Sequence, residues 1–295
     1  MAKTPTGMQT DIILAAIGLA TKPNVDHLLY VGDVLLADEL FRGKPKARKK
    51  LVQAVVSPIQ RPVAEAAGIP VVPLPEYDLG RPEKLKLALV SGIARGIFKE
   101  GEVVVGLLSR RPAAMPDSIL VVTVGQEEDD GSFGFLQAEG VSAGVMDALL
   151  DLAVSIGVEG WEGRPMGALF VVGDSSKVME KSRQLTLNPF QGYSEDEKNI
   201  MNPDVRHALH AFAVLDGAFV VREDGVVVAA GRYLNFDEDK DIDVPLGLGA
   251  RHMAAAGISR DSDAIAIVVS QTSGSVRVFR HGKAALELAP RIRRS

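Results

Sequence analysis

Three short signatures stand in order between Val214 and Ser270, and the rest of the chain is interpreted outward from them. Leu215-Asp216-Gly217-Ala218 places an acid and a glycine inside an apolar run. Gly247-Leu-Gly249-Ala250-Arg251-His252-Met253 leads into Ala254-Ala-Ala256-Gly257, and Asp263-Ala-Ile-Ala-Ile-Val-Val-Ser270 ends an apolar segment on a hydroxyl. The patterns predict an acid in a strand, a glycine-led helix start and a strand with a polar end. Together they indicate a site for an anionic ligand bound with a metal ion.

The acid at Asp216 is open to two interpretations. Asp-Gly between apolar runs is a strong local signature of a tight β-hairpin. That interpretation suits Asp224-Gly225 well, because Phe219–Val221 and Val226–Val228 flank it symmetrically. It suits Asp216 less well, because the apolar run continues on both sides of the pair. A carboxylate in an apolar strand is costly unless it is paired or binds a metal. Both the turn and the ligand role therefore remain open for Asp216.

The second signature places two basic side chains at the start of a helix. Gly249 precedes a run of strong helix formers that we expect to stop at Gly257. Arg251 and His252 would then lie in or just before the first helical turn, where the helix dipole favours anions over cations. An anion bound by backbone N–H groups and the guanidinium would remove this conflict. The alternative is that both side chains point into solvent.

The composition describes an ordinary globular protein. The 295 residues suggest two domains, with 46% hydrophobic and 24% charged residues. The net charge of −5 gives no basic footprint, so we expect no nucleic-acid partner. The chain has no cysteine, which excludes disulfides and thiolate metal sites. The apolar run at 12–20 is too short to span a bilayer and lacks a basic leader, so we expect no membrane association and a cytoplasmic location.

The first half predicts an α/β sandwich with a mostly parallel sheet. Strand candidates at 27–31, 51–56, 69–74, 102–107 and 118–124 alternate with helix candidates at 11–20, 34–42, 61–67 and 84–98. The basic segment 44–50 reads as a loop. The acidic run Gly125-Gln-Glu-Glu-Asp-Asp-Gly131 is the expected boundary. We therefore predict one domain at 1–128 and a second at 138–288.

The second half predicts a mixed sheet flanked by helices. Helices are expected at 142–156, at 177–183 with Asp174-Ser175-Ser176 as possible caps, and at 203–212. Gly140-Val-Ser142-Ala-Gly144 matches the nucleophile-elbow pattern of serine hydrolases, but a poor strand precedes it and Ser142 fits a helix N-cap better. The acidic run 237–243 mimics an EF-hand start, but Ile242 stands where the loop needs glycine. We interpret that run as a solvated loop.

In combination, the three signatures resemble those of the diadenylate cyclase domain, which is also found in the DNA-integrity scanning protein. Gly167-Ala-Leu-Phe-Val-Val-Gly-Asp174 and Asn188-Pro-Phe-Gln-Gly192 support the resemblance, which covers about residues 140–285. The first half is similar to the C-terminal α/β domain of pyruvate kinase, a pairing that resembles the archaeal-type branch of these cyclases.

The resemblance implies an activity and a set of site residues. Members of this family condense two ATP molecules into cyclic di-AMP with release of pyrophosphate. They use Mg²⁺ or Mn²⁺ and a face-to-face pair of domains in a homo-oligomer. Carried over, Asp216 would bind the metal and help activate the ribose 3′-hydroxyl. The other implied contacts are Gly217, Ala218 and Gly249 at the nucleotide backbone, Arg251 and His252 at phosphates, Ser270 at the triphosphate and Leu234 at the adenine.

Two positions depart from the pattern of many family members. Thr usually precedes the Arg-His pair and a second Arg follows it, whereas this chain has Ala250 and Met253. The missing cation weakens the expectation of phosphate binding. The rival hypothesis is therefore a catalytically inactive nucleotide-binding or sensor module on the same fold.

Overall fold

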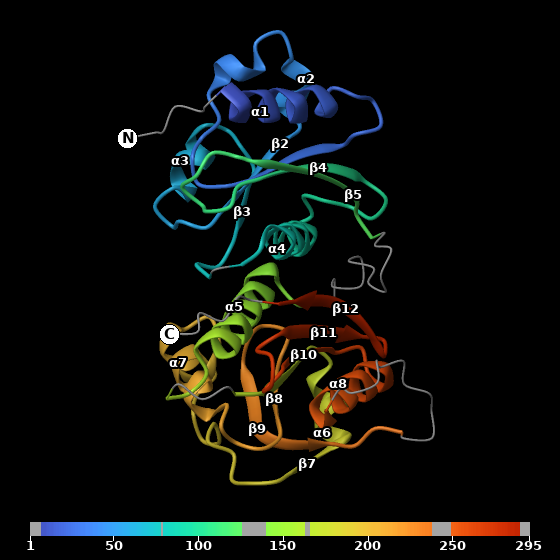
Figure 1. Ribbon diagram of the computed structural model, residues 1–295. Coiled ribbons are helices and arrows are strands. Elements are labelled where there is room, and N and C mark those ends of the chain that lie inside the picture. Colours follow the sequence, from blue (N-terminus) through green and yellow to red (C-terminus); the bar gives the residue numbers. More distant parts are fainter. Residues whose placement is uncertain (1–6, 78, 126–139, 163–165, 238–248, 290–295) are drawn as a thin grey trace. The chain divides into compact units, whose positions relative to one another are not determined.

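A computed structural model describes residues 7–77, 79–125, 140–162, 166–237 and 249–289 of the chain (Figure 1). The chain divides into two compact units, residues 1–134 and residues 135–295. The stretch between the two predicted domains, 129–137, lies outside the described residues. So does most of the acidic segment that mimics an EF-hand start. Within the described ranges, no helix combines the length and apolar character that a membrane crossing requires.

The first unit contains a five-stranded sheet in the order β3-β2-β1-β4-β5. Its strands are β1 (His27–Val31), β2 (Leu51–Val55), β3 (Val71–Pro73), β4 (Val103–Leu108) and β5 (Ser118–Thr123). Neighbouring strands are parallel except β5, which runs antiparallel to β4. β2 is buried along its whole length, as expected when helices cover both faces of a parallel sheet. The predicted α/β sandwich with a mostly parallel sheet is confirmed.

The helices of the first unit are α1 (Gly7–Ala20), α2 (Pro45–Lys49), α3 (Arg61–Ala66) and α4 (Arg81–Ala94). Helical spacing at 34–42 was a misleading signal, because the structure has only the short 3₁₀ turn η1 (Asp38–Phe41) there. Leu36 and Phe41 reach the core around an extended Ala37, so packing and not a helix explains the apolar spacing. The expected loop at 44–50 contains α2, with proline at its first turn.

The second unit contains a seven-stranded mixed sheet in the order β12-β11-β10-β6-β8-β9-β7. Its strands are β6 (Ala168–Val172), β7 (Ser182–Gln184), β8 (Ala218–Val221), β9 (Val227–Leu234), β10 (Ile265–Val269), β11 (Val276–Arg280) and β12 (Lys283–Leu288). β6 and β8 are parallel, and the other pairs are antiparallel. The β8–β9 hairpin turns at Asp224-Gly225, where Gly225 has φ of 92° and Arg222 N–H bonds the carbonyl of Val226. The hairpin predicted at Asp224-Gly225 is confirmed.

The helices described in the second unit are α5 (Ala143–Glu159), α6 (Ser175–Glu180), α7 (Pro203–Phe212) and α8 (Ala250–Asp261). A 3₁₀ turn, η3 (Asp196–Lys198), precedes α7. The hydroxyl of Ser142 accepts the backbone N–H of Val145 at 3.3 Å, which confirms the predicted N-cap of α5. Asp174 occupies the N-cap position of α6, as the sequence suggested, but its side chain forms no capping hydrogen bond. Its carboxylate accepts the N–H of Asp263 instead, tying the start of α6 to the chain just before β10.

The core of the second unit lies between α8 and the sheet. Ala255, Ala256 and Ile258 are fully buried against residues of β6, β8 and β10. The predicted stop at Gly257 is wrong, because α8 continues to Asp261. A Cβ atom at Gly257 would lie 2.2 Å from Cγ of Phe236. Glycine at this position therefore lets the Phe236 ring pack directly on the helix.

Candidate functional site

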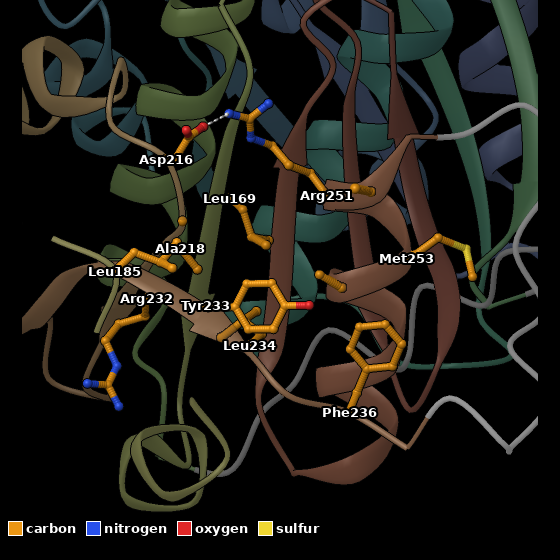
Figure 2. Close-up of a pocket in the computed structure, with 13 residues that line it drawn as sticks. Leu169, Leu185, Asp216, Ala218, Arg232, Tyr233, Leu234, Phe236, Arg251 and Met253 are labelled. Atoms are coloured by element: carbon orange, nitrogen blue, oxygen red, sulfur yellow. Dashed lines mark ion pairs between the residues drawn. The ribbon is translucent and has the colours of Figure 1, made fainter. Parts of the chain in front are cut away.

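A pocket of about 890 Å³ opens in the second unit between strands β8 and β9 and the first turns of α8 (Figure 2). This volume is within the range of small-molecule sites, roughly 300–1,000 Å³. The lining residues come from β6, β8, β9, α8 and the segments beside them: Leu169, Leu185, Asp216, Gly217, Ala218, Arg232, Tyr233, Leu234, Phe236, Ala250, Arg251, Met253 and Ala254. Five of the predicted site residues are thereby brought together: Asp216, Gly217, Ala218, Leu234 and Arg251.

Asp216 lies in a bend immediately before β8, not inside a strand as predicted. α7 ends at Phe212, and the backbone N–H of Leu215 donates to the carbonyl of Phe212. The apolar residues between them therefore form a turn and not the start of a strand. The side chain of Asp216 is 93% exposed, so the carboxylate remains solvated and does not need a metal ion to compensate for burial. The carboxylate is available to a ligand that enters the pocket.

Gly217 is fixed by its backbone neighbours. Its φ is 99°, and a Cβ atom there would lie 2.7 Å from both the amide nitrogen of Arg232 and the carbonyl carbon of Gly231. Only glycine avoids this collision with the β9 backbone. The tight approach holds the Asp216 bend against β9, and Ala218 then pairs with Arg232 in the ladder.

Arg251 is the second residue of α8, which begins after the N-cap residue Gly249. The prediction that this arginine lies in the first helical turn is confirmed. Its Nη2 atom lies 3.6 Å from Oδ1 of Asp216, and its Nη1 atom is 3.2 Å from the place where a Cβ atom of Gly167 would stand. Figure 2 shows the two charged groups facing each other at one end of the pocket. Glycine before β6 thus leaves room for the guanidinium beside the Asp216 carboxylate.

His252 follows Arg251 but turns away from the pocket lining. It is 5% exposed, and its Nε2 atom is 3.3 Å from Nη1 of Arg277 on β11. Burial lowers the pKa of His252, and the positive charge of Arg277 lowers it further, while Glu287 acts in the opposite direction. A guanidinium can only donate, so Nε2 must accept and the neutral ring carries its proton on Nδ1. His252 therefore has the environment of a neutral packing residue.

Ser270 lies at the end of β10 and is not among the lining residues. Its hydroxyl accepts the N–H of Ser273 at 3.3 Å, and its carbonyl accepts the N–H of Gly274. These bonds shape the turn into β11. The next residue, Gln271, approaches the same Gly167 position that Arg251 contacts, which puts this turn next to the charged end of the pocket.

The other end of the pocket is apolar and contains two aromatic residues that the sequence interpretation did not identify. Tyr233 and Phe236 flank Leu234, the residue expected at the adenine, near the end of β9. Leu185 and Leu169 complete this apolar end. The available signal was the run Arg232-Tyr-Leu-Asn-Phe236, which places two aromatic residues within two positions of Leu234.

The second arginine of the lining, Arg232, is occupied by the protein itself. Its guanidinium bonds the carbonyls of Met179 and Ser182 at 2.9 Å and 2.7 Å, and the hydroxyl of Ser182 at 3.0 Å. Figure 2 shows the side chain leading away from the centre of the pocket. Among the lining residues, Arg251 is thus the cation available to an anionic ligand.

Among the described residues, Asp216 is the one acid of the pocket lining, and no group of three or more metal-ligating side chains occurs. This donor set does not describe a resident metal centre. It does suit Mg²⁺ or Mn²⁺ bound to a nucleotide, because such ions use one or two carboxylates together with substrate phosphates and water.

Comparison with known proteins shows what the chain is similar to. Residues 155–284 match the model of a family described as DisA bacterial checkpoint controller nucleotide-binding, DAC. A diadenylate cyclase from Haloferax volcanii is 42% identical over 175 residues, which cover 59% of this chain and 64% of that protein. A diadenylate cyclase from Methanocaldococcus jannaschii is 37% identical over 207 residues, or 69% of this chain and 65% of that protein.

A shorter match is to the cyclic di-AMP synthase CdaA of Bacillus subtilis, which is 40% identical over 73 residues, or 25% of this chain and 26% of that protein. The chain matches slightly less than two thirds of the length of the two diadenylate cyclases. The family match lies within the unit that holds the pocket. The chain is therefore similar to the DAC family through the domain in its second unit.

Proposed function

We propose that this chain is a diadenylate cyclase that condenses two ATP molecules into cyclic di-AMP. The observation that carries the proposal is the polarity of the pocket in the unit that matches the family. Asp216 and Arg251 form one end, 3.6 Å apart, and Tyr233, Leu234 and Phe236 form the other. A nucleoside triphosphate has the same two-ended chemistry, with anionic phosphates and a flat base.

At the charged end, Arg251 binds phosphate oxygens of the triphosphate through its guanidinium, and Gly249 lets the phosphates approach the first turn of α8. In place of its ion pair with Arg251, Asp216 would hold a Mg²⁺ or Mn²⁺ ion bound to the phosphates. When bound, the metal ion supplies charge neutralisation and a lower pKa for the attacking hydroxyl. Gly217 and Ala218 keep the backbone close to the nucleotide.

The proposed reaction is two displacements at phosphorus. In each, the ribose 3′-oxygen of one ATP forms a bond to the α-phosphorus of the other, and the bond from that phosphorus to pyrophosphate breaks. The hydroxyl proton leaves toward the Asp216 carboxylate and then to water. With one ATP in each pocket, both hydroxyls are aligned only when the pockets of two copies face each other. The homo-oligomer is thus part of the active site, and alignment supplies several kcal/mol of the barrier reduction.

A second candidate function is nucleotide binding without turnover. Met253 lines the pocket at the position where many family members carry a second arginine, and Arg232 is bonded to carbonyls. Phosphate binding then depends on Arg251, the helix start and the metal. Met253→Arg distinguishes the candidates. In an active cyclase it raises ATP affinity modestly, whereas in a sensor it would create turnover where the wild type has none.

The facing arrangement gives the proposal a test of its own. Specific activity with ATP and Mn²⁺ should rise with protein concentration and then reach a plateau as the active oligomer saturates. The oligomeric state, measured by light scattering over the same concentrations, should change in parallel. Specific activity that stays constant while the protein is monomeric would refute the facing arrangement. A serine hydrolase is not supported, because the Ser142 hydroxyl caps α5.

A further inference from the structure

A cation is stacked on the aromatic ring at the apolar end of the pocket. β7 and β9 are antiparallel neighbours, and their register sets Arg183 directly opposite Tyr233. Directly opposed residues project from the same face of a sheet. The guanidinium carbon of Arg183 lies 4.7 Å from the centroid of the Tyr233 ring, within the range of a cation–π contact. Arg183 is not itself a lining residue, so it contacts the pocket through Tyr233.

Tyr233 is the aromatic residue of the lining that remains open. Its exposure is 45%, which is high for a large ring that borders a pocket. Phe236, the other aromatic residue of the lining, packs its ring onto α8 at Gly257. An exposed aromatic face beside apolar residues is the arrangement that proteins use to stack nucleobases.

Among the described residues, no carboxylate forms an ion pair with the guanidinium of Arg183. The Arg183 side chain is exposed on the edge strand β7. Arg232, the residue before Tyr233 on β9, differs in this respect, because its guanidinium bonds two carbonyls and a hydroxyl. The stacking on Tyr233 is therefore the contact that defines the position of Arg183.

We propose that Arg183 is a positioning residue for the base of the bound nucleotide, an inference that rests on the proposed function. It holds the Tyr233 ring in one orientation, so that less side-chain freedom is lost when a base stacks on the ring. The guanidinium also draws π-electron density away from the opposite ring face, which strengthens stacking with an electron-rich purine. Affinity for the base thus depends on a residue that the nucleotide does not touch.

The test compares ATP with inorganic tripolyphosphate, which has the charges but no base. Dissociation constants are measured by calorimetry on the full chain and on Arg183→Met, Tyr233→Leu and Tyr233→Phe. We expect Tyr233→Leu to weaken ATP binding about ten-fold, the scale of one stacked base. Arg183→Met should weaken it about three-fold, the scale of one exposed cation–π contact. Tyr233→Phe should bind nearly as the wild type does, and tripolyphosphate affinity should stay unchanged throughout.

Two further variants test whether the effect of Arg183 comes from its stacking on Tyr233 or from its charge alone. Lys283→Met removes one positive charge at β12, the opposite edge of the same sheet, and should leave ATP affinity unchanged. Adding Arg183→Met to Tyr233→Leu should cost nothing further, because the arginine acts through the ring. An equal loss of ATP and tripolyphosphate affinity in Arg183→Met, or no loss of either, overturns this inference. A wild type that binds no ATP overturns the proposed function instead.

Discussion

Nη2 of Arg251 lies 3.6 Å from Oδ1 of Asp216, so the positive guanidinium and the negative carboxylate of the pocket form an ion pair. The two residues are 35 positions apart in the sequence. The Gly217 bend brings one to β8, and the Gly249 helix start brings the other. In the proposed function, a metal-bound triphosphate would offer a cation to the carboxylate and anions to the guanidinium. Binding would then replace one ion pair by two, and each member of the pair can be tested separately.

Asp216→Asn should abolish formation of cyclic product and leave the fold intact. The side chain is 93% exposed, so the change in the free energy of unfolding should stay within about 0.5 kcal/mol. Loss of the negative charge removes the metal ligand and the proton acceptor together. Product is measured by mass spectrometry, and folding by thermal unfolding. Asp196→Asn, another exposed aspartate, is the matched control. Turnover close to that of the control would leave Asp216 with a role in the bend alone.

Arg251→Ala should weaken ATP binding by about 1.5–3 kcal/mol, the scale of a hydrogen bond to a charged group. Arg251→Lys should recover part of this loss, because the charge remains and the two-pronged geometry does not. Calorimetry with ATP and Mg²⁺ measures both. If the alanine variant binds ATP as tightly as the wild type, the phosphates lie elsewhere.

His252 should contribute to pH-dependent stability more than to ATP affinity. Burial and the charge of Arg277 lower its pKa below 6.5 in the folded protein. The unfolded chain therefore binds more protons near pH 6, and folding stability rises with pH there. The contribution is fully present above about pH 6.5 and is lost as the pH falls through the lower folded pKa. His210 also has a lowered pKa, so it must be present in both proteins when a His252 variant is compared with the wild type.

His252→Gln isolates this effect. Its melting temperature should fall less than that of the wild type between pH 7.5 and pH 5.5, and its affinity for ATP should change less than that of Arg251→Ala. A large loss of ATP affinity with an unchanged pH profile would restore the phosphate-binding role that the family resemblance implies for His252.

Gly217→Ala should destabilise the second unit by about 2 kcal/mol or more, because the new Cβ atom collides with the β9 backbone. Gly192 has a similar φ of 91° but open space around it. Gly192→Ala should therefore cost only the conformational strain, about 1 kcal/mol. Chemical denaturation measures both variants. Equal costs would show that the backbone around Gly217 can move away.

The sequence patterns predicted elements well where apolar residues form a continuous run or recur at helical spacing. β1 and β2 are such continuous runs, α7 shows the helical spacing, and the Asp224-Gly225 hairpin follows its turn signal. The helix expected at 34–42 failed because its apolar residues enter the core from different directions. Gly257 was taken for a helix stop, since no local pattern shows that Phe236 packs on it.

The charged end of the pocket was more predictable than the apolar end. Asp216, Gly217 and Arg251 belong to short motifs with a chemical reason for each residue type. Tyr233 was missed, because its meeting with Arg183 depends on the register of β7 against β9. Register between strands separated by about fifty residues is decided by tertiary packing, which a local pattern does not contain.

The most direct test of the central claim is a mass analysis of the products that the full chain forms from ATP. Purified protein is incubated with ATP and either Mn²⁺ or Mg²⁺, with the metal omitted in one sample. Cyclic di-AMP should accumulate with two pyrophosphates per molecule of product, and only when metal is present. Failure to form cyclic di-AMP with either metal, by a folded protein that binds ATP, would contradict the cyclase account and favour the nucleotide-binding alternative.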